Sequence, residues 1–117
     1  MTTSPTAPGD PREIATQMLA LARALSAALA EQPGEHHDAY PAVLATLSEV
    51  TAENAAATGI IEEAAAGIGA ARLSGWWESA ASSARDARLS LMSAAGELLT
   101  TSREAKSGQD KLAQAEP

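Results

Sequence analysis

The sequence has no cysteine and no phenylalanine, and only one tyrosine, two tryptophans and two histidines among its 117 residues. The absence of cysteine excludes disulfide bonds, thiolate catalysis and cysteine-ligated zinc. The β-branched and aromatic residues that favour strands are few, whereas 29 residues are alanine. Intrinsic preference therefore favours helix along almost the whole chain, and we predict an all-α fold.

Long apolar runs are also absent. No stretch approaches the ~20 apolar residues that a membrane span needs, so we expect no membrane insertion. The opening residues MTTSPTAPGDPRE lack the basic region and apolar core of a cleavable signal peptide. We therefore expect a protein that is cytoplasmic or is exported without a cleavable signal peptide.

Positive charge is missing from the middle of the chain. The formal net charge is -7, and no lysine or arginine occurs between Ala24 and Ala71, where seven acidic residues lie. Binding to nucleic acid or to anionic lipid needs a surface of the opposite sign. We therefore expect no nucleic-acid partner, and we expect a partner protein with a basic surface.

The chain is predicted to begin with a disordered tail over residues 1–9, which are rich in Thr, Ser, Pro and Gly. A single helical domain should follow over residues 10–114. Its first helix, at about residues 11–31, is predicted from an Asp10-Pro11 start signal and from apolar residues at helical spacing, beginning with Ile14 and Met18.

A second helix is predicted at about residues 39–73. Apolar and small residues there alternate spacings of four and three, which is typical of a line that packs against another helix. The members of this line are Val43, Leu47, Val50, Asn54, Ala57, Ile61, Ala64, Ile68 and Ala71.

A third helix is predicted at about residues 76–113, with its own line of small and apolar residues, formed by Trp77, Ala80, Ala84, Ala87, Leu91, Ala94, Leu98 and Thr101. Because only a short turn at Ser74-Gly75 joins the two long helices, they should fold back as an antiparallel hairpin. With the first helix this gives a three-helix bundle dominated by the hairpin. Trp77 is expected to fill the tip of the hairpin between the two helices.

The third helix carries a second apolar line on a different side, formed by Leu89, Met92, Gly96 and Leu99. A two-helix hairpin needs only one line per helix. Either the first helix covers this second line, or a separate chain does.

No group of residues favours catalysis. Glu62 and Glu63 lack the histidines of a di-iron bundle site, since none follows His37. The loop Glu35 to Asp38 holds the only cluster of residues with metal-ligand chemistry, and its adjacent histidines lack helical ligand spacing. We therefore predict no enzyme, no cofactor and no metal, with a metal-dependent enzyme or metal-storage bundle as a rival interpretation.

The composition and the two apolar lines predict a helical interaction module that binds a protein partner or itself, as a dimer or a higher oligomer. An acidic inhibitor or antitoxin-like protein that masks a basic partner is the alternative. The residues predicted to bind the partner are Trp76 as an anchor, Leu89, Met92 and Leu99 as an apolar stripe, and Glu49, Glu53, Glu62 and Glu63 as a charged rim.

The stretch GWWESA at residues 75–80, within an alanine-rich and cysteine-free pair of helices, resembles the turn of the small Trp-X-Gly proteins of type VII (ESX) secretion systems. The resemblance covers residues 40–113. It implies an antiparallel hairpin, dimer formation and export by a dedicated machine. In this chain glycine precedes the tryptophans, as Gly75-Trp76-Trp77, and the Trp-X-Gly motif itself is absent.

Overall fold

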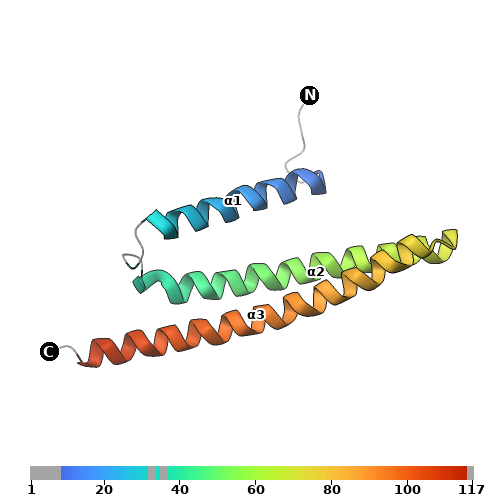
Figure 1. Cartoon of the computed structure of the whole chain (residues 1–117). Helices are drawn as coiled ribbons and strands as arrows, with labels where there is room; N and C mark the ends of the chain where they lie inside the picture. The colour runs from blue at the N-terminus through green and yellow to red at the C-terminus, as the bar shows by residue number, and fades with distance from the viewer. Residues whose placement is uncertain (1–8, 32–33, 35–36, 116–117) are drawn as a thin grey trace. The chain divides into compact units, whose positions relative to one another are not determined.

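The structure is a computed structural model that describes residues 9–31, 34 and 37–115. It contains α1 (Pro11–Glu31), a short 3-10 helix, η1 (His37–Ala39), and two long helices, α2 (Tyr40–Arg72) and α3 (Gly75–Ala115) (Figure 1). No strand occurs among the described residues. The predicted all-α class and the predicted hairpin are confirmed, since α2 and α3 pack against each other. The predicted tail falls almost entirely on residues 1–8, outside the described residues.

The chain divides into two compact units, Met1–His37 and Asp38–Pro117. Within the first unit, α1 starts where the sequence predicts it. Asp10 caps the helix, because its Oδ1 accepts the backbone N–H of Arg12 at 2.9 Å. The Arg12 guanidinium also donates to both carboxylate oxygens of Asp10, at 3.3 and 2.9 Å. These hydrogen bonds, first from the side chain and then from the backbone of Arg12, hold the pKa of the Asp10 carboxyl below its ordinary value.

In the second unit, the turn between α2 and α3 is made by Leu73 and Ser74. Leu73 adopts a left-handed conformation with φ 51° and ψ 41°. The backbone N–H of Ser74 then reaches back to the carbonyl of Gly69 at 3.0 Å, which closes the end of α2 in a Schellman-type cap. The Ser74 hydroxyl accepts the backbone N–H of Trp77 at 3.4 Å and caps α3. One serine therefore ends one helix and begins the next.

The interface between α2 and α3 is built from small residues at seven-residue intervals. Its fully buried side chains are alanines and serines with one proline, and no large side chain is completely buried. Ser48 Oγ donates to the carbonyl of Ala95 at 2.7 Å, and Ser102 Oγ donates to the carbonyl of Pro41 at 2.6 Å. A hydroxyl can reach the main chain of the opposite helix only where the two backbones approach closely. The buried residues of the two helices are Pro41, Ser48, Ala55, Ala65, Gly69, Ala95 and Ser102.

The predicted contact line of α2 is displaced by one residue from this interface. The sequence predicts Leu47, Asn54 and Ile61 in the line, whereas the interface holds the following residues Ser48, Ala55 and Glu62. One residue corresponds to a rotation of about 100°. The physical reason is the close approach: only small side chains fit between the backbones, so the larger aliphatic residues lie beside the interface.

The predicted line of α3 is partly correct. Ala84, Leu91 and Leu98 are half-buried as expected, but the alternate positions are taken by Arg88, Ala95 and Ser102 and not by their preceding residues. Trp77 is 43% exposed, so the expectation that it fills the tip between the helices is wrong.

Candidate interaction surface

The hairpin has two faces, which follow from helical geometry around the interface series Pro41, Ser48, Ala55, Glu62, Gly69 on α2 and Arg88, Ala95, Ser102 on α3. Residues that precede a member by one position, or follow it by two positions, lie on one face of the hairpin. Residues that follow a member by one or by four positions lie on the other face. Because α3 runs antiparallel to α2, the same rule selects the same face on both helices.

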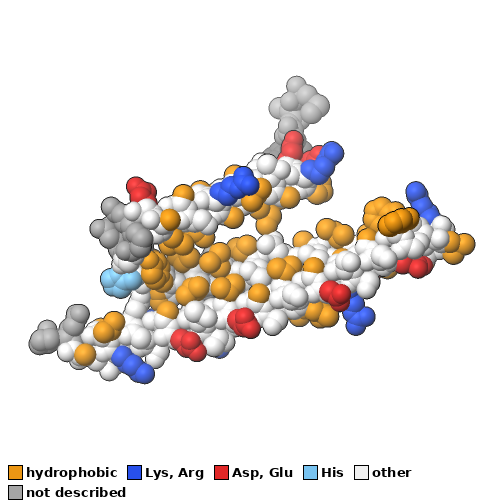
Figure 2. Space-filling view, in the orientation of Figure 1, with side chains coloured by type: hydrophobic (Ala, Val, Ile, Leu, Met, Phe, Trp, Pro, Cys, Tyr) orange, Lys and Arg blue, Asp and Glu red, His pale blue; other side chains and the backbone are white. Residues whose placement is uncertain are grey.

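We call the first of these surfaces the apolar face. On α2 it consists wholly of uncharged residues, and on α3 it adds a row of small side chains. Of its larger members, Val50 is exposed and Ile61 is 62% exposed, whereas Val43, Leu47 and Ile68 are half-buried. Hydrophobic side chains along the hairpin are visible in Figure 2. The apolar face comprises Val43, Leu47, Val50, Asn54, Ala57, Ile61, Ala64, Ile68 and Ala71 on α2, and Ala87, Ala94 and Thr101 on α3, with Ser90, Glu97 and Glu104 along its α3 edge.

Periodicity alone predicts these same α2 residues in the hairpin contact and does not reveal their exposure to solvent. The signal that could have found it is size. Within an alanine-rich pair, the smallest side chains at seven-residue spacing mark the closest contact, whereas Val50, Ile61 and Ile68 are too large for it. A row of aliphatic residues beside such an interface is a surface that favours association.

The second surface, which we call the mixed face, holds the predicted stripe of α3. Leu89, Met92 and Leu99 all lie on it, with exposed fractions between 38% and 55%. Met92 Sδ accepts a weak hydrogen bond from Arg88 Nη1 at 3.8 Å. Basic residues of α3 flank the stripe, and Glu49 and Glu63 of α2 lie on the same face.

The four predicted rim glutamates divide into two groups. Glu49, Glu53 and Glu63 are exposed, and none of them forms a salt bridge with a described residue. Glu62 differs, because its Oε1 accepts a hydrogen bond from Arg88 Nε at 2.8 Å across the hairpin, with both side chains largely covered. Glu62 is therefore an interface residue of the hairpin and not part of a free acidic rim. Its partner Arg88 lies with its Cδ against the backbone of Gly59.

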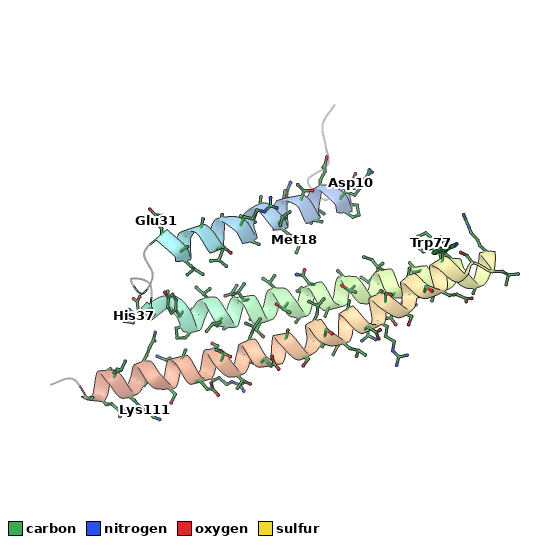
Figure 3. All side chains as sticks on the ribbon, in the orientation of Figure 1. Asp10, Met18, Glu31, His37, Trp77 and Lys111 are labelled. Atoms are coloured by element: carbon green, nitrogen blue, oxygen red, sulfur yellow. The ribbon has the colours of Figure 1, made fainter. Side chains whose placement is uncertain are left out.

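The tip of the hairpin carries the most exposed large apolar side chains. Leu73 is 90% exposed and Trp76 is 88% exposed. The adjacent Trp77 is labelled in Figure 3, where its side chain lies beside the ribbon near the turn. Leu73 is also the only described non-glycine residue with a positive φ. A leucine in a left-handed conformation is unfavourable by about 1–2 kcal/mol, so the turn holds an apolar side chain at the position where glycine is usual.

The remaining candidate features are simpler. In the described part of the chain, no group of three or more histidine, cysteine or acidic residues comes together as metal ligands. Of the predicted metal-capable loop, Glu35 and His36 lie outside the described residues, and His37 Nδ1 lies 2.8 Å from the carbonyl of Gly34. None of the described helices is long and apolar enough to cross a membrane.

The comparisons with known proteins give no relative. No family model, no curated protein and no solved structure matches this chain.

Proposed function

We propose that this protein is a non-catalytic helical interaction module that binds a protein partner, or a second copy of itself, through apolar surface on the α2–α3 hairpin. The observation that carries the proposal is the distribution of apolar side chains. The buried hydrophobic side chains among the described residues are Ala55, Ala65 and Ala95, whereas many leucine, isoleucine and methionine side chains and both tryptophans are exposed. Association would remove this apolar area from water, at about 25 cal/mol per Å².

Two regions support contact with a partner. Trp76 and Leu73 protrude from the tip, and a large aromatic side chain is the residue type that most often contributes strongly at interfaces. Leu89, Met92 and Leu99 form the stripe on the mixed face. Both regions present side chains that the hairpin does not use for its own packing.

The experiment that tests this proposal combines solution mass with cross-linking in the native host. We expect either a mass well above the 11.9 kDa of one chain or one cross-linked partner. The Trp76→Ala and Leu99→Asp variants should weaken that association while keeping the helical circular dichroism of the parent. A strictly monomeric chain without a cross-linked partner, and indifferent to both substitutions, would contradict the proposal.

A second candidate is an acidic inhibitor that masks a basic partner. It is favoured by the exposure of Glu49, Glu53 and Glu63 without salt bridges to described residues. Changing the three residues to glutamine separates the two candidates. An inhibitor that acts by charge should lose most of its affinity for the partner, whereas an interface dominated by apolar contacts should lose little.

The resemblance to the small Trp-X-Gly proteins adds a proposal about export. A hairpin of two long helices with tryptophan beside the turn is the arrangement that the resemblance implies, and α2, α3, Trp76 and Trp77 support it. We propose that the protein is a type VII-secreted or secretion-associated protein. Comparison of culture filtrates from a host with and without its type VII machinery tests this, since release that does not depend on the machinery would exclude it.

A further inference from the structure

We infer that the apolar face of the hairpin binds an amphipathic helix of a different protein, whose apolar stripe is flanked by lysine and arginine. This inference rests on the proposed function and adds the surface and the chemistry of the partner. It concerns a face that lies opposite the predicted stripe of Leu89, Met92 and Leu99.

The apolar face differs in composition between its two helices. Its α2 side holds no charged residue from Val43 to Ala71, over about 40 Å at 1.5 Å per residue. The side chains on its α3 side are smaller and protrude less, because the row there is Ala87, Ala94 and Thr101. A line of aliphatic side chains beside a line of small ones suits a helix that contributes residues at i, i+3, i+4 and i+7.

Negative charge lies beside the apolar face. Glu97 and Glu104, two residues after Ala95 and Ser102, lie on the α3 edge of the apolar face, and both are exposed. Glu53 is exposed on the outer side of α2. Acidic side chains spaced along α3 are visible in Figure 2. The α3 edge of the face is therefore acidic, and Glu53 is the one acidic residue near its α2 edge.

Apart from Lys111, seven residues after Glu104 near the end of α3, and Arg72 at the tip, the basic residues of α2 and α3 lie elsewhere. Arg85 and Arg103 belong to the mixed face by their spacing. Arg88 is held in the interface by Glu62, and Lys106 pairs with Asp110 at 3.2 Å on α3 itself. Complementarity at the apolar face therefore selects a partner with positive flanks.

A second copy of the chain fits this face less well. Two copies joined through it with α3 against α3 would bring the acidic α3 edges together, and each copy carries a formal charge of -7. Like charges placed across an interface oppose association and suppress the wrong partner. The charge pattern thus favours a complex with a different protein over self-association at this surface.

The test uses the full chain and two synthetic helical peptides of about three heptads with the same leucine stripe. One peptide carries lysines beside the stripe and the other carries glutamates. Calorimetric titration at low salt should show binding of the lysine peptide at least about ten-fold tighter than that of the glutamate peptide. At about 1 M salt, where screening acts over ~3 Å, the difference should largely disappear.

Matched variants locate the binding. Ile61→Asp should abolish binding of the lysine peptide, whereas Leu89→Asp on the mixed face should not. The double variant Glu97→Gln, Glu104→Gln should lower the affinity for the lysine peptide about three- to ten-fold. The double variant Glu49→Gln, Glu63→Gln removes the same charge from the mixed face and should leave the affinity for the lysine peptide unchanged. Circular dichroism of each variant separates loss of binding from loss of fold.

The remaining outcomes overturn the inference. Equal binding of the two peptides, or loss of binding that follows the mixed-face variants, would exclude a basic partner at this face. Binding of neither peptide would show that the face does not accept a separate helix. Self-association that Ile61→Asp abolishes would leave the interaction module standing and replace the basic partner by a second copy.

Discussion

Gly69 of α2 lies directly against Glu78 of α3, near the turn of the hairpin. A Cβ atom added to Gly69 would come within 2.8 Å of Glu78 Cγ and 3.0 Å of the Glu78 backbone nitrogen. The carbonyl of Gly69 also accepts the N–H of Ser74, which closes the turn. This glycine sets how closely the two helices approach where they join.

The contact predicts opposite effects for two glycines of one helix. Gly69→Ala should destabilise the hairpin by about 1–2 kcal/mol, because the strain of overpacking exceeds the gain in helix propensity. Gly67→Ala has no neighbour within 4 Å of the added Cβ and should stabilise it by about 1 kcal/mol. Urea unfolding of the two variants measures both effects. Two changes of the same sign would mean that α3 does not lie against Gly69.

Ser48 provides a second test of the close approach, in the middle of the interface. Ser48→Ala removes one hydroxyl bonded to the carbonyl of Ala95 and should cost about 0.5–1.5 kcal/mol. Ser48→Leu should cost more, about 1–3 kcal/mol, because the helices must separate to admit the side chain. The exposed Ser93 is the control, since Ser93→Leu should change the midpoint of thermal unfolding little. A tolerated leucine at Ser48 would contradict the interface described here.

Replacing the large apolar side chain of Leu73 by glycine should increase the stability of the chain. Its side chain is 90% exposed, so little burial is lost in Leu73→Gly. The left-handed backbone becomes unstrained in glycine, and the free energy of unfolding should rise by about 1 kcal/mol. Leu73→Ile places a β-branched residue in the same conformation and should lower the free energy of unfolding. If Leu73 also contacts a partner, the glycine variant will fold more stably and bind more weakly.

The stability of the first turn of α1 should depend on pH through the carboxyl of Asp10. The pKa of its carboxyl is lowered in the folded chain, so its contribution to helix stability is complete above the unfolded value of about 3.9. That contribution is lost as the pH falls through the lower, folded pKa. NMR titration of the full chain should show the Asp10 midpoint below 3.9, with the amide of Arg12 reporting fraying at the same pH. Asp10→Asn keeps a capping oxygen and should remove this transition.

Several features were predictable from the sequence because they depend on local preferences. The start of α1 follows from Asp10 and Pro11, which suit a helix terminus wherever it lies. The two long helices follow from alanine content and periodicity, and their antiparallel pairing follows from a connection too short for any other arrangement. The exposure of Trp76 also agreed with its place next to the turn.

The candidate surface was less predictable, because periodicity shows that a helix has an apolar stripe but not which neighbour covers it. The stripe from Val43 to Ala71 was assigned to the hairpin contact, and it proved to lie beside that contact. Glu62 was expected among exposed acids, and it lies instead in the interface with Arg88. In both cases the deciding quantity was the distance between two backbones, which is a property of the pair of helices.

The sequence by itself determined that this chain is helical, where its helices begin and end, and that α2 and α3 fold back on each other, because these depend on residues close together in the chain. The tertiary structure alone decided which side of each helix turns inward. Alanine, serine and glycine allow the backbones to come so near that larger side chains are displaced outward, and so the residues that fit the hairpin least became its exposed apolar face.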